Sequence, residues 1–281
     1  MKITDIVIGT ANFGNEKYGI KNYNKNSLTK IKSLINFAQK NGIQKLDTSL
    51  EYKGVYNNLS KVNLMGFKVS SKFTLKKYSK NLIKNFRKDF LISLKKLGIK
   101  KYDNFFFHNI DDFNNTKKVK DIIEILRIFK KNKLINKIGV SLNSPQEIKK
   151  IQKKFRPDIV QIPFNLFDRR ILDKKLLSQY KGIEIQIRSI FLQGLLLNKK
   201  LKIKKFKKLI DFLDLWHKKK KLNHLESSIN FITSQKCIDK YVIGFQNLKQ
   251  INEILKTKKV KISNFPRYNN DYLKDPRKWI D

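Results

Sequence analysis

Four residues of types that can move protons follow apolar, strand-like runs in the first half of the chain. Asp47 and Tyr52 lie in KLDTSLEY, Lys72 in FKVSSKF and His108 in FFFHNID. A tyrosine holds its proton up to about pH 10, and a lysine keeps its charge to a similar pH. A Lys72 ammonium beside the Tyr52 hydroxyl would favour the phenolate and lower the pKa of Tyr52, with Asp47 keeping the lysine charged and oriented. With His108 donating a hydrogen bond to a substrate oxygen, the set would act as a general acid toward a carbonyl.

Short runs of β-branched and aromatic residues recur through the chain, and apolar residues repeat at helical spacing between them. In SLTKIKSLINFAQKNG, for example, Ser27 or Thr29 can cap the start of a helix and Asn41-Gly42 its end. We count eight strand-then-helix units, which predicts parallel strands, because antiparallel neighbours need only a tight turn. The predicted strands are residues 5–9, 45–48, 67–72, 102–108, 137–142, 158–163, 183–189 and 241–245.

This alternation predicts the α/β class and a (β/α)8 TIM barrel, a single domain over residues 1–281. No change in composition and no Pro/Gly/Ser-rich linker marks a second domain. Residues 190–240 are longer than one unit requires and contain two helix patterns, and residues 258–281 are expected to form a C-terminal tail packed on the barrel. Reactive groups in such barrels stand at the carboxyl ends of the strands. Asp47, Lys72 and His108 are therefore expected to meet at the barrel mouth.

The formal charge of the chain is +40, from 63 Lys and Arg against 23 Asp and Glu. A charge of this size holds anions close at low salt and allows a basic barrel that binds nucleic acid or other polyanions. Only eight of the basic residues are Arg, the better reader of phosphates and bases, and the lysines are scattered over every predicted helix. The composition therefore favours a compositional bias over a specific nucleic-acid site.

Other residues that could do chemistry have simpler explanations. The single cysteine, Cys237, excludes an internal disulfide and a cysteine-cluster metal site, and we expect it to fill space in a helix. His217 and His224 fall in helical patterns where solvation is expected, and the pair Asp111-Asp112 is typical of a solvated loop or a helix cap. The sequence therefore predicts no metal site.

No apolar run approaches the roughly 20 residues of a membrane-spanning helix, and the first ten residues lack the apolar core of a signal peptide. These observations predict a cytoplasmic protein without a membrane partner. The oligomeric state, monomer or dimer, stays open.

With these motifs in order, the chain resembles the aldo-keto reductase superfamily from IVIGTANFG near its start to IGFQNLKQINEI near residue 254. DTSLEY places Asp47 and Tyr52 at the five-residue spacing of that family, VSSKF supplies Lys72 and FFFHNID supplies His108. Further similar stretches are GVSLNSPQEI, VQIPFNLFDRR and RSIFLQGLLL.

The resemblance implies reduction of an aldehyde or ketone by hydride from a nicotinamide cofactor, with Tyr52 as the acid, Lys72 and Asp47 tuning it, and His108 orienting the carbonyl. NADPH is the expected cofactor, with NADH possible. The residues that the resemblance places at the cofactor are Thr10, Ala11, Ser141, Gln161, Arg188, Ser189, Gln193, Gly194, Gly244, Gln250 and Glu253. Among them, Ser141 and Gln161 would hold the carboxamide, residues 189–194 the pyrophosphate, and Gly244, Gln250 and Glu253 the adenosine end.

This sequence departs from the family pattern at several cofactor positions. Leu142 stands where an Asn often follows the carboxamide serine, and Arg188 stands where many members place an aromatic ring. Basic residues that grip a 2′-phosphate in many members are missing near Gly244, where Phe245 stands with Lys249 the nearest cation. The preference between NADPH and NADH is left open by these changes.

The substrate is expected to be a small-molecule carbonyl compound, a sugar or a small aldehyde. Candidates to line its pocket are Phe13, Tyr18, Phe164 and Phe167. A second hypothesis is a binding or regulatory subunit that holds the cofactor with little turnover, and the polyanion-binding barrel is a third.

Overall fold

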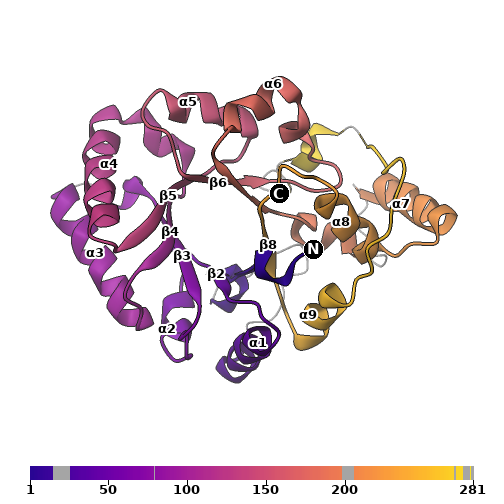
Figure 1. The fold of residues 1–281 in the computed structure, drawn as a ribbon, viewed down its shortest axis with the longest axis horizontal. Helices are drawn as coiled ribbons and strands as arrows, with labels where there is room; N and C mark the ends of the chain where they lie inside the picture. The colour runs from indigo at the N-terminus through magenta and orange to yellow at the C-terminus, as the bar shows by residue number, and fades with distance from the viewer. Residues whose placement is uncertain (15–25, 79, 198–205, 269, 275–278, 280–281) are drawn as a thin grey trace.

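A computed structural model gives the fold, and it describes residues 1–14, 26–78, 80–197, 206–268, 270–274 and 279. Eight parallel strands close into a barrel in the order β1 to β8, which confirms the predicted (β/α)8 architecture. Figure 1 looks along the barrel, with the strands forming the central ring and the helices lying around it. The strands are β1 Ile6–Gly9, β2 Lys45–Asp47, β3 Lys68–Phe73, β4 Tyr102–Phe107, β5 Ile135–Ser141, β6 Ile159–Pro163, β7 Glu184–Arg188 and β8 Lys240–Gly244.

The α-helices of the described residues fill the connections between strands. They are α1 Leu28–Lys40, α2 Val55–Leu59, α3 Leu82–Leu97, α4 Thr116–Lys131, α5 Ile148–Gln152, α6 Lys174–Leu177, α7 Lys207–Lys220, α8 His224–Thr233 and α9 Leu248–Leu255. The connection from β7 to β8 carries two helices, as its length predicted. No α-helix in the described ranges is long and apolar enough to cross a lipid bilayer.

Local sequence explains where a helix begins and which of its faces packs against the barrel. The side chain of Asn115 caps α4 by accepting a hydrogen bond from the Lys118 N–H. The apolar residues of α4, among them Val119, Ile122 and Leu126, recur at helical spacing and are buried against the barrel. The strands β2, β4 and β6 are buried along nearly their whole length, as parallel strands covered by helices must be.

The register of the barrel brings the ends of the strands together. Asp47 pairs with Gly9 on one side and Ser70 on the other, and Ser141 pairs with Gln161. The backbone N–H of His108, the residue after β4, donates to the Phe73 carbonyl at the end of β3 with a distance of 2.7 Å. Residues that were far apart in the sequence therefore share one rim.

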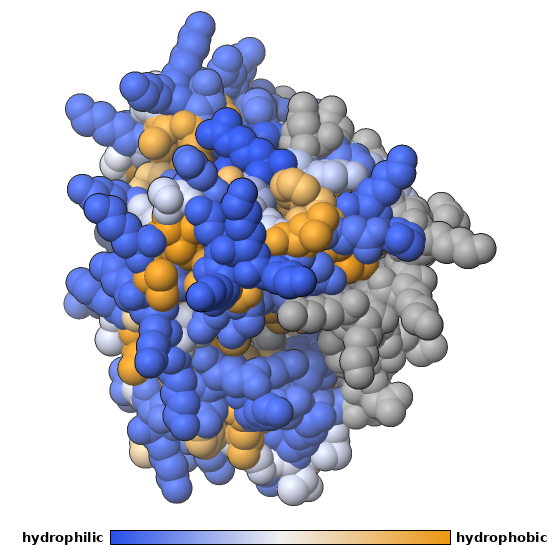
Figure 2. Space-filling view, turned by 90° about the vertical axis from the view of Figure 1, so that its right-hand side faces the viewer, coloured by the Kyte–Doolittle hydropathy of each residue, from blue (hydrophilic) through white to orange (hydrophobic). Residues whose placement is uncertain are grey.

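The described part of the C-terminal segment contacts the helices between β7 and β8. The ring of Phe265 packs against Trp216 and Phe231, and Trp279 packs edge-on against Phe206 at 4.9 Å. Figure 1 shows this yellow segment beside α7 and α8. The side of the molecule that carries α7 is covered mostly by hydrophilic side chains, with apolar ones between them (Figure 2).

Candidate active site

A buried ion pair joins the ends of two neighbouring strands. Asp47 is the last residue of β2, Lys72 is the penultimate residue of β3, and the Lys72 ammonium contacts Asp47 Oδ2. The two residues are only 3% and 1% exposed. The Gln161 amide donates to Asp47 Oδ1 at 3.0 Å, and Lys72 also donates to the Thr48 carbonyl at 3.3 Å. Buried charges persist when they are paired and hydrogen-bonded, and this pair meets both conditions.

Tyr52 lies beside this pair, in the turn between β2 and α2. The turn is fixed by backbone bonds, because the Leu50 N–H donates to the Lys72 carbonyl at 2.8 Å and the Tyr52 N–H donates to the Ser49 carbonyl at 3.2 Å. The Lys72 Nζ atom lies 5.8 Å from the centre of the Tyr52 ring. The structure therefore brings together the tyrosine, lysine and aspartate that the sequence singled out.

The pKa of Tyr52 moves in the direction opposite to our expectation. We predicted that Lys72 would lower it, but burial and then the Asp47 carboxylate raise the pKa of Tyr52 above its ordinary value, and Arg188 only partly opposes them. The physical reason is that Asp47 already neutralises Lys72, so the dominant effect left is the loss of water around a phenolate. Tyr52 consequently keeps its proton at neutral pH, which is the state that a proton donor needs.

His108 is held neutral and edge-on to Tyr52. Its ring centre lies 5.9 Å from that of Tyr52, in a T-shaped arrangement. Burial, followed by the positive charges of Lys72 and Arg188, lowers the pKa of His108 to about 3. A neutral imidazole carries a single N–H, so the partner of one ring nitrogen decides which nitrogen can donate to a substrate.

Ser49 is that partner. Its hydroxyl oxygen lies 3.1 Å from His108 Nδ1 and accepts a hydrogen bond from the Glu51 N–H at 3.1 Å. A hydroxyl that donates to Nδ1 leaves the ring hydrogen on Nε2, where it can donate to a carbonyl oxygen. The Ser49 hydroxyl could also donate to the Lys72 carbonyl oxygen, but that oxygen is 3.4 Å away, farther than His108 Nδ1.

A cavity of about 900 Å³ opens over the carboxyl ends of the strands. Tyr52 lines it together with the last residues of four strands, Gly9, Asp47, Arg188 and Gly244. The other expected cofactor-binding residues that line the same cavity are Thr10, Ala11, Gln161, Ser189, Gln193, Gly194, Gln250 and Glu253. The volume is in the upper part of the range for ligand and cofactor pockets.

Arg188 is anchored across the mouth by the end of β5. Its guanidinium donates to the Leu142 carbonyl at 3.0 Å and to Asn143 Oδ1 at 3.2 Å. The planar group therefore has a fixed position on the cavity wall, close enough for its charge to act on both Tyr52 and His108. Leu142 thus contributes its backbone rather than its side chain to the site.

The cavity walls near β7 and β8 combine a turn with positive φ angles and an open glycine position. After β7, Ser189, Gln193 and Gly194 have φ angles of 59°, 54° and 95°, and turns of this kind aim N–H groups into anion-binding concavities. At the end of β8, a Cβ atom built on Gly244 would meet only the Gly9 carbonyl oxygen, at 3.7 Å. The space over Gly244 is therefore open to a ligand, and the residues present fit an extended nicotinamide cofactor.

Several expected site residues lie away from this cavity. Ser141 is buried beside Gln161 at the end of β5 and is not among the described residues that line the cavity. Phe13 and Phe164 are fully buried, and Phe164 stacks on Phe231 in the core, while Phe167 packs against Tyr268. The structure thus places these three phenylalanines in packing roles, and Tyr18 lies outside the described residues.

Two local expectations were wrong, and a third held in part. His217 and His224 are buried rather than solvated, because α7 and α8 pack together around them. Asp111 is exposed, whereas Asp112 is buried and accepts hydrogen bonds from a threonine hydroxyl and, at 3.0 Å, from the N–H of Leu75, the first residue of a short 3-10 helix, as a helix cap does. Cys237 lies in the turn before β8 and not in a helix.

The sequence profile of the aldo/keto reductase family matches residues 5–267. The chain belongs to the aldo/keto reductase family. This membership confirms the resemblance inferred from the motifs and supports an oxidoreductase that reduces carbonyl compounds. No match was found among curated proteins.

Solved structures with the same fold include two that are described as aldo-keto reductases. A predicted aldo-keto reductase from Pseudomonas aeruginosa aligns over 90% of this chain and 88% of its own, with 15% identity and a TM-score of 0.65. A second structure described in the same way, also from Pseudomonas aeruginosa, shares 14% identity over the same fractions, with a TM-score of 0.65. The protein Gox0644, in its apo form, aligns over 92% of this chain and 85% of its own, with 15% identity and a TM-score of 0.64. At these identities the likeness extends to the fold alone.

Two residues of the site were missed from the sequence, Ser49 and Asn143. Ser49 lies within the DTSLEY motif, where its spacing from Asp47 places it at the same rim, but its partner His108 is 59 positions away. Asn143 follows a strand, which was a usable signal, but only the barrel closure puts its side chain against Arg188. Contacts between separate strand ends are not encoded in local spacing.

Proposed function

We propose that this aldo/keto reductase reduces a small aldehyde or ketone, a sugar or sugar derivative among them, with Tyr52 as the proton donor and NADPH or NADH as the hydride source. The observation that carries the proposal is the buried Asp47–Lys72 pair beside a protonated Tyr52 at the wall of a large cavity. The nicotinamide, when bound, supplies the hydride, and the side chains supply position and the proton.

Tyr52 and His108 would contact the carbonyl oxygen of the substrate. Both can donate to an acceptor, since Tyr52 is protonated and a neutral His108 can carry its hydrogen on Nε2. As negative charge develops on that oxygen, the Tyr52 hydroxyl transfers its proton to it. The positive charge of Arg188, which lowers the pKa of Tyr52, would favour the phenolate that remains.

Residues of the opposite wall would hold the cofactor. The turn from Ser189 to Gly194 suits the pyrophosphate, and Gly244 leaves room for the nucleotide beside it. At the far end, both Glu253 and Lys256 line the cavity. A carboxylate suits the ribose hydroxyls of NADH and a lysine suits the 2′-phosphate of NADPH, so the balance between these two residues sets the preference.

The test is a fluorescence titration of the purified chain with NADPH and with NADH up to millimolar concentration. We expect saturable quenching by at least one of them, followed by cofactor oxidation when small aldehydes or aldose sugars are added. A chain that binds neither cofactor refutes the proposal. A chain that binds a cofactor tightly but oxidises it with none of the carbonyl compounds supports the regulatory-subunit hypothesis instead.

A further inference from the structure

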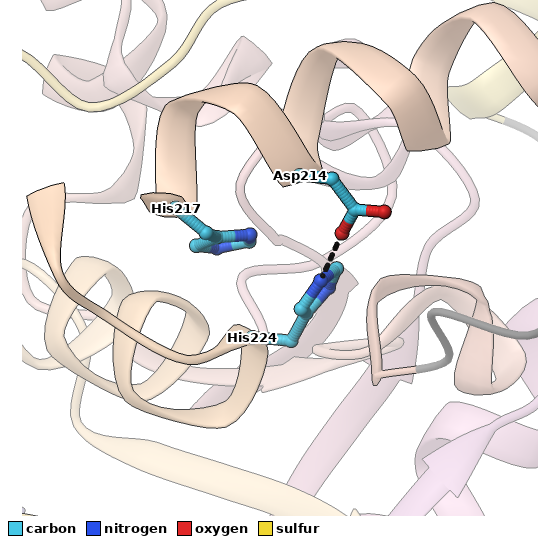
Figure 3. A group of neighbouring side chains, drawn as sticks. All are labelled: Asp214, His217 and His224. Atoms are coloured by element: carbon cyan, nitrogen blue, oxygen red, sulfur yellow. Dashed lines mark hydrogen bonds and ion pairs between the residues drawn. The ribbon is translucent and has the colours of Figure 1, made fainter. Parts of the chain in front are cut away.

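The helices α7 and α8 bring together three side chains of types that bind metals, one Asp and two His. Asp214 and His217 lie one turn apart on α7, and His224 is the first residue of α8 (Figure 3). One ligand atom from each residue lies within 4.8 Å of the others. The two histidines are 3% and 5% exposed, and their rings are 4.1 Å apart. Asp214 and His217 are not among the described residues that line the large cavity, and His224 forms part of its wall.

The contacts of His224 orient one of its nitrogens toward the carboxylate. Nδ1 lies 3.0 Å from the Leu196 carbonyl oxygen, which can only accept, so Nδ1 carries a hydrogen. Nε2 lies 2.9 Å from Asp214 Oδ1, which also only accepts, so this contact needs a proton between the two atoms, and a metal ion bound by the same two atoms would replace that proton (Figure 3). A backbone carbonyl that fixes one nitrogen of a histidine is the usual support for metal binding through the other nitrogen.

His217 is oriented by a second hydrogen bond. The Ser227 hydroxyl lies 3.1 Å from the His224 carbonyl, to which it can donate, and its oxygen lies 2.7 Å from His217 Nε2. Ser227 therefore occupies Nε2 of His217, so Nδ1 is the nitrogen through which this ring would bind a metal. The side chain of Asn223 and that of Glu226 form a capping box that fixes the start of α8, where His224 lies.

We propose that Asp214, His217 and His224 form a zinc site that clamps α7 to the start of α8. The ligands would be Asp214 Oδ1, Nδ1 of His217 and Nε2 of His224, a nitrogen and oxygen set that zinc accepts in tetrahedral geometry with water in the fourth position. Two ligands about 2.1 Å from a tetrahedral ion lie about 3.4 Å apart. The 2.9 Å separation of the Asp214 and His224 atoms would therefore open slightly, and ligand atoms that are now up to 4.8 Å apart would move closer together.

The surroundings favour zinc over magnesium or calcium and leave a route for the ion. The cluster has one carboxylate and two imidazoles, whereas the harder cations require several oxygen ligands. Four lysines, residues 218–221, follow His217 directly, and their positive charges repel a cation. With one carboxylate at the site, binding has to come from strong coordination by the imidazole nitrogens. The Asp214 side chain is 41% exposed and His224 lines the large cavity, so an ion can enter from either side.

The experiment measures zinc binding to the full chain after removal of metals with a chelator, in a Cys237→Ser background that lacks the only thiol. Isothermal titration should give one zinc ion per chain and a raised melting temperature, with no such response to magnesium. The Asp214→Asn variant should bind zinc at least about tenfold more weakly, because a neutral amide is a poor ligand. Because Asp214 is partly exposed and Asn has the same shape, this variant should fold.

The matched control is Asp211→Asn, one turn earlier on α7, where the carboxylate pairs with Lys207 and not with a histidine. It should bind zinc as the parent does. The chain has only three histidines, so imidazole nitrogen NMR should show His217 and His224 shifting with one equivalent of zinc while His108 does not. Absence of saturable binding, equal loss in both variants, or a shift of His108 in place of the other two overturns the proposal.

Discussion

The rim of β2 to β4 and the helix pair α7–α8 both gather buried polar side chains, but they do so by different means. At the rim, Asp47, Lys72 and His108 lie within one residue of the ends of successive strands, and the parallel register aligns them. In the helix pair, His217 and His224 meet because a short connection folds α8 back onto α7. The first arrangement follows from the barrel itself, and the second depends on one local packing contact.

The difference also shows in what each group of residues can do. The rim contains a charge pair that is already satisfied, a tyrosine with its proton and a neutral histidine, and of these residues Asp47 and Tyr52 line the large cavity. The helix pair has two buried imidazoles and a carboxylate that reaches solvent. These differences underlie our proposals of proton transfer at the rim and of ion binding at the helix pair.

The largest effect on activity is expected from Tyr52→Phe, which removes the proton donor and little else. General acid catalysis contributes about 100- to 10,000-fold, so kcat for carbonyl reduction should fall within that range while cofactor binding persists. Steady-state kinetics and a cofactor titration measure the two quantities. Tyr268→Phe is the control, because Tyr268 contacts Phe167 and Phe212 through its ring, away from the rim. Unchanged turnover in Tyr52→Phe would leave the rim without a catalytic role.

The next largest effect is expected on stability, from Lys72→Met. It leaves the Asp47 carboxylate buried without its cation, which should lower the free energy of unfolding by about 3–5 kcal/mol in denaturant titrations. Adding Asp47→Asn to this variant should restore much of that stability and none of the activity. If the double variant were as unstable as the single one, burial of an unpaired charge would not be the cause.

The pH dependence of stability should report His108. Its pKa is lowered to about 3 in the folded chain from an ordinary value of 6.5, so the unfolded chain takes up the proton first as pH falls. This contribution to stability is intact above pH 6.5 and is lost as pH falls toward 3. The free energy of unfolding of the wild type should therefore decline more steeply over this window than that of His108→Asn, measured by urea titrations. Parallel curves would contradict the lowered pKa.

A smaller effect is expected from Ser49→Ala, which removes the partner of His108 Nδ1. A fall in kcat of about tenfold is expected, comparable to the net value of one hydrogen bond, with the melting temperature nearly unchanged. Imidazole NMR should show the hydrogen of His108 redistributed between its nitrogens. Ser93→Ala is the control, because Ser93 is also buried and hydrogen-bonded, to Tyr102 and outside the cavity. A fixed His108 tautomer in Ser49→Ala would refute the positioning role.

The smallest effect is expected on cofactor affinity. Gly194→Ala and Gly98→Ala each place a side chain at a positive φ, 95° and 64°, and each should lower stability by about 1–2 kcal/mol. Only Gly194 lines the cavity, and Gly98 ends α3 with open space around it. Cofactor affinity should therefore fall in Gly194→Ala alone. Equal cofactor affinities in the two variants would show that the turn after β7 does not bind the cofactor.

Much of the architecture could be predicted from sequence because its signals are local. The alternation of strand and helix patterns predicted the closed barrel, and the observed strands agree with the predicted ones within about two residues at their ends. Asp47, Lys72 and His108 were found because a polar residue at the end of an apolar strand is visible in the sequence. The directions of the pKa shifts were less accessible, since burial of Tyr52 depends on residues from distant strands.

The sequence by itself determined the fold class, the family and the polar residues Asp47, Lys72 and His108 at the strand ends, since periodicity, strand-end position and motif spacing are properties of short stretches. Only the tertiary structure decided that Tyr52 keeps its proton, that Ser49 faces His108, and that His217 and His224 are buried together. These outcomes depend on desolvation and on contacts between residues far apart in the chain or on separate helices. Both arise only when the barrel has closed and the helices have packed.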